Sequence, residues 1–211
     1  MVPVRVKQEI IGSKQYFDYK ERCVFCDIIA QEEQAAARVV ENRGDYISLC
    51  PYAPHPHVER RYLVVPGIRS SRIHIIDTKP DPRKPEIVKV IEPEEVFART
   101  NYSRPHTIHC GPEGIYVSAL GAPNGDGPGG IFMLDCETFE ILGQWEMDRG
   151  PQFFQYDFWW HLGFDTLLSS EWGTPNMIEN GVQPDLLLGS KYGHQMHVWD
   201  LRRRRHLQAL D

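Results

Sequence analysis

GGIFMLDCETFEILGQWE (residues 129–146) has a layout that occurs twice more in the chain, in SRIHIIDTKPDPRKPEIVKVIEP (71–93) and HQMHVWDLRRRRHLQALD (194–211). In each stretch, a strand of alternating apolar and polar residues ends at an aspartate. A polar turn follows, and then a second strand with the same alternation. The aspartates that take this place are Asp77, Asp135 and Asp200. Because an aspartate at a strand end can accept hydrogen bonds from the N–H groups of a turn, the pattern predicts three similar β-hairpins.

Further strand-like runs lie beside these hairpins: RRYLVVP (60–66), HTIHCGPEGIYVSALG (106–121) and YDFWWHLGFDTLLSSEW (156–172). They predict four strands in each repeated unit, and such a repeat is typical of a β-propeller with long insertions. A β-sandwich would not need the same hairpin three times. In RYLVVP both faces are apolar, as in a strand covered on two sides. The segment GAPNGDGPGG (121–130) is predicted to be a loop.

The composition limits the classes of protein and partner. The chain has 211 residues, a net charge of −6 and 41% hydrophobic residues, which is ordinary for one or two soluble globular domains. We find no run of apolar residues long enough for a membrane span and no signal peptide, and the net acidity argues against a nucleic-acid partner. Arg202–Arg205 is interpreted as a solvated turn. Five cysteines, an odd number, favour reduced thiols in the cytoplasm; a periplasmic location stays open if a longer form carries a signal.

Residues 1–50 differ from residues 51–211 in the secondary structure that their sequence predicts, so we divide the chain there. CDIIAQEEQAAARVV (26–40) is predicted to be a short helix that runs into the strand DYISL (45–49). CPYAPHPHVERR (50–61) is proline-rich and stiff. The expected fold class is therefore mainly β, with a short α+β segment at the N-terminus.

Two histidines in RPHTIHC (104–110) are the best candidates for metal chemistry. His106 and His109 would lie on opposite faces of a regular strand, but a bend after Pro105 would let them converge. Imidazole suits copper and zinc, and Cys110 would add a soft ligand if it turned inward. The alternative is that both histidines are hydrogen-bonded structural residues.

Two other features could carry chemistry. Cys23 and Cys26 form half of a zinc site, which His55 and His57 would have to complete at an unusual spacing; inert thiols are the alternative. The run YDFWWHLG (156–163) either packs between sheets or forms an aromatic wall for a small apolar substrate.

Residues 51–211 resemble the selenium-binding protein (methanethiol oxidase) family. The motifs are PHPHVERRYLVVPG, SRPHTIHCGPEGIYVSALG, GPGGIFMLDCETFEILGQWE and YGHQMHVWDLRRRRHLQ, in the family's order. The resemblance implies a seven-bladed propeller, of which this chain would form about three blades. It also implies a copper-dependent oxidase that converts methanethiol, a small thiol, into formaldehyde, hydrogen sulfide and hydrogen peroxide.

The same resemblance assigns roles to residues. His106 and His109 stand in the family's HTxHC motif and become copper-ligand candidates; Cys50 stands near a cysteine-containing segment and becomes a weaker thiol or selenium candidate. The family's adjacent histidines before that cysteine are absent here, and so is all that follows the third hairpin. We therefore expect a fragment that is inactive by itself, whose open edge strands could associate.

Residues 1–54 resemble the C-terminal half of galactose-1-phosphate uridylyltransferase, through VKQEIIGSKQYFDYKERCVFCDIIAQEEQ and RVVENRGDYISLCPYAP. The PHPH motif is not in the context of that family's nucleophile. We interpret the join as a chimera or an assembly artefact. Two alternatives to the oxidase stay open: a uridylyltransferase fragment and a non-enzymatic propeller scaffold.

Overall fold

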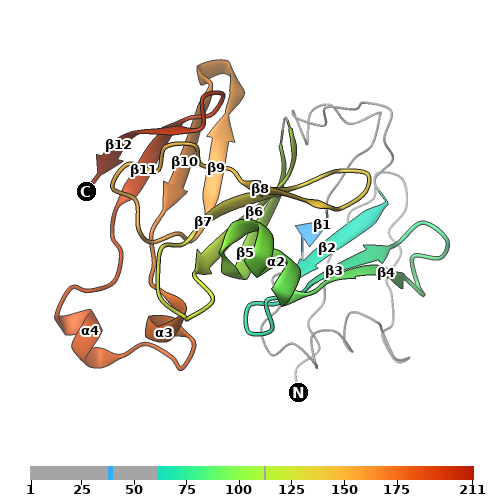
Figure 1. Cartoon of the computed structure of the whole chain (residues 1–211), viewed down its shortest axis with the longest axis horizontal. Helices are drawn as coiled ribbons and strands as arrows, with labels where there is room; N and C mark the ends of the chain where they lie inside the picture. The colour runs from blue at the N-terminus through green and yellow to red at the C-terminus, as the bar shows by residue number, and fades with distance from the viewer. Residues whose placement is uncertain (1–37, 40–60, 112) are drawn as a thin grey trace, which may run out of the picture.

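The computed structural model describes residues 38–39, 61–111 and 113–211, and this part of the chain is mainly β (Figure 1). Its strands form three four-stranded antiparallel sheets, and in each sheet the strands follow one another in chain order. The first sheet consists of β1 (Arg38–Val39), β2 (Tyr62–Pro66), β3 (Ile73–Asp77) and β4 (Glu86–Ile91). The second consists of β5 (Ser103–Gly111), β6 (Gly114–Gly121), β7 (Gly130–Leu134) and β8 (Ile141–Gln144). The third consists of β9 (Phe158–His161), β10 (Thr166–Ser170), β11 (Met196–Asp200) and β12 (Arg205–Leu210). The predicted four-strand repeat is confirmed.

The outer two strands of each sheet form the hairpins that the aspartates predict. Asp135 Oδ1 accepts hydrogen bonds from the backbone N–H groups of Glu137 and Thr138, at 2.9 and 2.8 Å. Asp77 Oδ1 accepts from Lys79 N at 3.0 Å, and Asp200 Oδ1 accepts from Arg203 N at 2.7 Å. Each aspartate thus satisfies turn donors that no strand partner reaches.

One prediction about local structure is wrong. Arg38 and Val39 were expected at the end of a helix, but they form β1 and pair antiparallel with Val64 and Leu63 of β2. The helical periodicity of the sequence before Arg38 carries no information about this pairing, because the partner strand lies far along the chain. The remainder of the predicted helix and the strand 45–49 lie outside the described residues.

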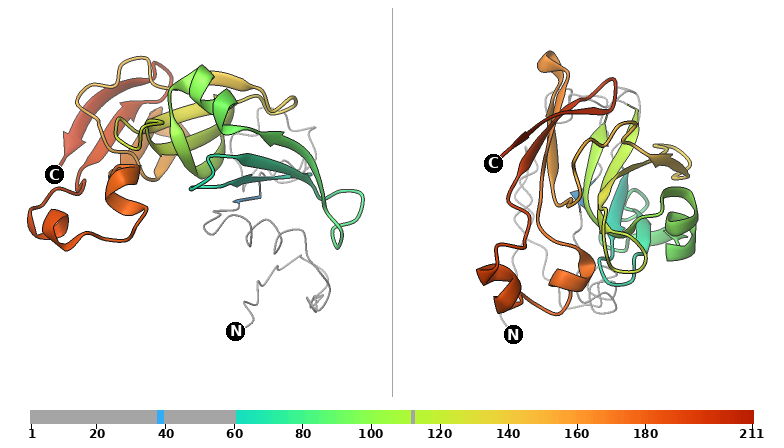
Figure 2. Two further views of the ribbon diagram at one scale, coloured as in Figure 1. Left: turned by 60° about the horizontal axis from the view of Figure 1, so that its bottom comes forward. Right: turned by 60° about the vertical axis from the view of Figure 1, so that its left-hand side comes forward.

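Two apolar cores separate the sheets, and the second sheet lies between them (Figures 1 and 2). The core between the first and second sheets contains Val64, Ile75, Val117 and Phe132, all fully buried. The core between the second and third sheets contains Tyr116, Ile131, Trp145, Leu167 and Trp199. Both faces of the second sheet are therefore covered, which explains why its central strands β6 and β7 are buried along their whole length.

The outward face of the third sheet is apolar and exposed. Leu168 lies opposite Trp159 on β9 and Val198 on β11, and Met196 lies opposite Leu210 on β12. Trp159 is 63% exposed, whereas Leu167 and Trp199 on the opposite face are fully buried. The aromatic run YDFWWHLG therefore contributes to the core through Phe158 and Trp160 and leaves Trp159 exposed.

Short helices lie outside the sheets. α2 (Pro93–Thr100) begins with a capping box between Glu92 and Glu95 and buries Val96 in the first core. α3 (Pro175–Ile178) and α4 (Pro184–Leu188) lie together at one end of the third sheet, and η1 (Leu162–Phe164) joins β9 to β10 (Figure 1). Among the described residues, no helix has the length and apolar character needed to cross a membrane.

Two predicted connections have the expected form. Residues 122–129 form turns, bends and irregular backbone between β6 and β7, so the predicted loop 121–130 holds except for its first and last glycines, which belong to strands. Arg202–Arg204 form the turn before β12, and every arginine of the run Arg202–Arg205 lies near a carboxylate, contributed by Asp165, Asp200 or Glu113. This arrangement fits a solvated turn rather than a surface for anions.

Candidate functional site

β5 carries both candidate histidines, and a bulge sets their directions. Pro105 lies opposite Ala119 and Ile108 opposite Val117, so β5 has one more residue than β6 over this interval. Thr107 N donates to Ser118 Oγ at 2.9 Å inside the bulge. The extra residue changes the alternation of side chains along β5, so His106 and His109 both face the third sheet. The bulge lies where a bend was expected.

His106 packs against the chain segment that enters the third sheet. Its ring centroid lies 4.7 Å from that of Tyr156, and its Nδ1 lies 3.0 Å from Thr107 Oγ1. Tyr156 in turn contacts the Trp172 ring edge-on at 5.0 Å, and its carbonyl oxygen accepts from Ser118 Oγ at 2.7 Å. The His106 ring is thus held between its own strand and an aromatic pair.

His109 lies farther along the same segment, among three aromatic rings. The centroids of Phe158, Trp159 and Trp160 lie 5.1, 4.5 and 5.4 Å from that of His109, all near-perpendicular to it. His109 Nε2 lies 3.9 Å from Asp157 Oδ1. Both imidazoles therefore meet one stretch of chain. We call His106, His109 and residues 156–160 the histidine–aromatic site.

Among the other predicted site residues, Cys110 is the one that the structure describes, and it does not join this cluster. Cys110 lies opposite Ile115 on β6, whereas His109 lies opposite Tyr116, so Cys110 belongs to the face toward the first sheet. Cys23, Cys26 and Cys50 lie outside the described residues, and the zinc and selenium roles stay predictions. Within the part of the chain that the structure describes, no three His, Cys, Asp or Glu side chains gather in a way that could hold a metal ion.

A buried polar cluster elsewhere in the second sheet is structural. Glu146 Oε1 accepts from Ile131 N at 2.6 Å, and Tyr102 donates its hydroxyl to Glu146 Oε2 at 3.1 Å. Burial raises the pKa of both groups, which disfavours their charged forms. Arg149 bonds the Tyr102 hydroxyl and, at 2.5 Å, the Gly129 carbonyl oxygen. These hydrogen bonds connect loop 122–129 to the segment after β8.

Sequence reasoning identified the two histidines and the aromatic run but did not connect them. It missed Asp157 and Trp172, which touch the site because the chain returns to β5 after passing through β7 and β8. The signal that could have linked them is the four-strand repeat itself, since it places the first strand of each unit next to the first strand of the following unit.

Known proteins are similar to this chain in sequence and in fold. The family model described as 56kDa selenium binding protein matches residues 39–211. The methanethiol oxidase of Danio rerio is 40% identical over 157 residues, 74% of this chain and 34% of the relative. The selenium-binding protein 2 of Mus musculus is 40% identical over 152 residues, 72% of this chain and 32% of the relative.

A solved structure gives the same result. The X-ray structure of a hypothetical selenium-binding protein from Sulfolobus tokodaii is 57% identical, with a TM-score of 0.71, and covers 74% of this chain and 34% of that one. The chain spans about a third of the length of the proteins it matches. The family match includes residues 39–50, and the expected boundary near residue 50, like the uridylyltransferase resemblance, stays a prediction. From its match to the family model and to these relatives, the chain belongs to the selenium-binding protein family.

Proposed function

We propose that this chain is part of a copper-dependent methanethiol oxidase, and that His106 and His109 supply imidazoles to the copper. The reaction combines methanethiol, dioxygen and water into formaldehyde, hydrogen sulfide and hydrogen peroxide, one molecule of each. The observation that carries the proposal is the bulge in β5, because it turns both histidines of the HTIHC motif toward the same chain segment. Curated relatives that bear the name methanethiol oxidase support it.

The three sheets fit the proposed architecture of consecutive blades in a seven-bladed propeller. Each has four antiparallel strands in chain order, and each packs face to face on the next. Leu168, Met196 and Leu210, exposed on the outward face of β10–β12, form the kind of surface that a further blade would cover.

The two histidines fit copper by donor type. Imidazole nitrogen binds copper well, and both rings are held in place by aromatic neighbours. Because the described residues offer no group of three ligands, the remaining ligands must come from outside that part of the chain. When bound, copper would accept electrons from the thiol and pass them to dioxygen.

The protein's own residues prepare the site in two ways. The Asp157 carboxylate near His109 Nε2 can orient that imidazole as a metal ligand. Trp159, in contact with His109 and 63% exposed, offers an apolar face to a methyl group and a sulfur atom. In this proposal the aromatic run supplies an aromatic wall for a small apolar substrate, which is one of the two interpretations of its sequence.

Addition of methanethiol to the copper-free chain tests the substrate class, with methanol as a control of similar size that lacks sulfur. We expect the indole N–H signal of Trp159 to shift in NMR spectra, whereas the buried Trp199 indole, which donates to Ser169 Oγ at 2.9 Å, stays in place. No shift at Trp159, or an equal shift with methanol, would remove the support for a thiol site here.

A further inference from the structure

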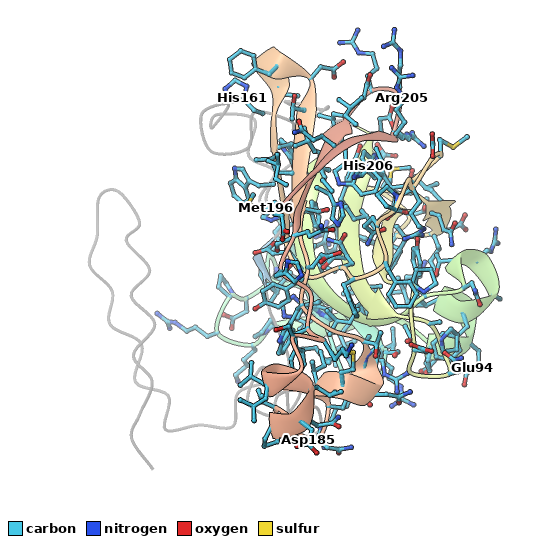
Figure 3. The ribbon with its side chains drawn as sticks, turned by 90° about the vertical axis from the view of Figure 1, so that its left-hand side faces the viewer. Glu94, His161, Asp185, Met196, Arg205 and His206 are labelled. Carbon is cyan, nitrogen blue, oxygen red and sulfur yellow. The ribbon has the colours of Figure 1, made fainter. Side chains whose placement is uncertain are left out.

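Three ionisable side chains form a hydrogen-bonded relay across the third sheet, apart from the histidine–aromatic site. His197 on β11 is fully buried. Its Nε2 lies 3.0 Å from Glu171 Oε1, just after β10, and its Nδ1 lies 3.0 Å from His206 Nε2 on β12. We call Glu171, His197 and His206 the relay. Figure 3 shows His206 on the outermost strand, next to Arg205.

The Glu171 carboxylate lies between two backbone N–H groups and His197. Its Oε2 accepts from the backbone N–H groups of His194 and Gln195, both at 3.2 Å, while Oε1 faces His197. An ionised carboxylate has no hydrogen to give, so in the relay that we infer His197 Nε2 carries the proton and donates to Glu171 Oε1. His197 Nδ1 then accepts from His206 Nε2, which leaves the lone pair of the neutral His206 ring on Nδ1.

We propose that the relay is a proton-binding site that takes up one proton without rearrangement and opens when it takes up a second. The first proton adds to His206 Nδ1 and leaves both hydrogen bonds of the relay intact, with Glu171 supplying the countercharge through His197. A second proton, on His197 Nδ1, would set two N–H groups against each other across the 3.0 Å contact. That contact must then break, and the charged His197 ring would lie in a fully buried position.

The relay lies beside a seam between the second and third sheets. His206 N donates to Asp148 O at 2.8 Å, and Met147 N donates to Arg204 O at 2.8 Å. The His206 ring lies so close to Gly150 that a Cβ there would come within 2.8 Å of it. Movement of the His206 ring therefore disturbs the seam, which we define as residues 147–150 paired with residues 204–206.

The surroundings favour an uncharged His206. Burial lowers the pKa of His206 below its usual 6.5, nearby His197 lowers it further, and Asp148 opposes both effects. Because the folded state prefers the neutral ring, this contribution to stability is present above pH 6.5 and is lost as the pH falls below it. Other charged or titratable groups on the elements around the relay are Asp148 and Arg149 after β8, Glu113 and Tyr116 near the start of β6, Asp200 and Arg203–Arg205 in the β11–β12 hairpin, and His194 with Asp211.

NMR titration of the histidine Cε1–H signals in the full chain tests the proposal. We expect the signals of His197 and His206 to change together, in two separate steps, as the hydrogen-bonded contact between their rings implies. In H206Q the His197 signal should follow a single step, because its partner in the coupled pair is gone. In H194Q, a matched change at an exposed histidine in the segment just before β11, the two-step behaviour should remain. Independent single-step titrations, unchanged by H206Q, would overturn the proposal.

Amide hydrogen exchange supplies a second readout that does not depend on a variant that folds. In the unaltered chain the amides of Met147 and His206 should exchange faster once the second proton binds, while amides in β7 keep their protection. Uniform protection of the seam throughout the second titration step would contradict the proposed opening.

Discussion

Asp157 Oδ1 lies 3.9 Å from His109 Nε2, so a carboxylate at the entrance to the third sheet faces an imidazole on the first strand of the second. Asp157 keeps its place because Oδ1 also accepts from Phe158 N at 2.8 Å. The contact shows how a site can be built between two sheets by the segment that connects them.

Replacement of Asp157 by Asn should weaken copper binding. The substitution keeps the size of the side chain but removes the charge that orients His109, and loss of such a partner lowers metal affinity by about tenfold. Titration calorimetry with copper measures the change. Asp165→Asn, in the left-handed position after η1, is the control and should bind as the unaltered chain does. Equal affinities for both variants would show that Asp157 does not act on the metal site.

Asp135→Ala should destabilise the second sheet. The aspartate satisfies two turn N–H groups, and their loss should cost about 1–2 kcal/mol in the free energy of unfolding. Urea denaturation gives this value. Glu137→Ala, an exposed change in the same turn, should alter the free energy by less than about 0.5 kcal/mol. A similar effect for the two variants would mean that the turn does not depend on the Asp135 carboxylate.

Trp199→Ala and Trp159→Ala should have very different effects on stability. Trp199 is fully buried in the core between the second and third sheets, and its removal should cost about 3–5 kcal/mol. Trp159 is 63% exposed, and its loss should cost less than about 1 kcal/mol. Thermal and urea unfolding compare them. If the Trp159 variant were the less stable of the two, the assignment of the faces of the third sheet would be wrong.

The decrease in the free energy of unfolding at acid pH should depend on Asp77. The hydrogen bond from the Arg61 guanidinium, with help from the Lys79 N–H group, holds the pKa of Asp77 below its ordinary 3.8. A lowered pKa gives stability that is present above pH 3.8 and is lost as the pH falls toward the folded-state value. Asp77→Asn should therefore flatten the decline in unfolding free energy below that pH. Asp81→Asn, an exposed change in the same hairpin, should leave the decline as it is.

The sequence predicted the hairpins because their determinants are local. An alternating strand, an aspartate and a polar turn lie within about twenty residues, and Asp77, Asp135 and Asp200 each form the expected turn bonds. The prediction for β1 was wrong because Arg38 and Val39 form a strand only by pairing with β2, more than twenty residues away. The start of α2 at Pro93, by contrast, has a local signal in Glu92 and Glu95.

The site was predicted only in part, because only some of its determinants are local in the sequence. His106 and His109 stand out by spacing, and the bend near Pro105 is local. Their partners Tyr156 and Asp157 depend on the packing of one sheet on the next. The relay was missed because Glu171, His197 and His206 come from three separate parts of the third sheet: the end of β10, β11 and β12. Alternation along β11 already places His197 on the buried side with Trp199.

Copper binding by the doubly substituted chain H106Q/H109Q tests the central claim most directly. The number of copper ions bound per chain is measured by titration and metal analysis, with H194Q as the control. We predict that the double variant binds one copper ion fewer than the unaltered chain, while H194Q binds the same number. Equal copper binding by the double variant and the unaltered chain would contradict the assignment of His106 and His109 as copper ligands.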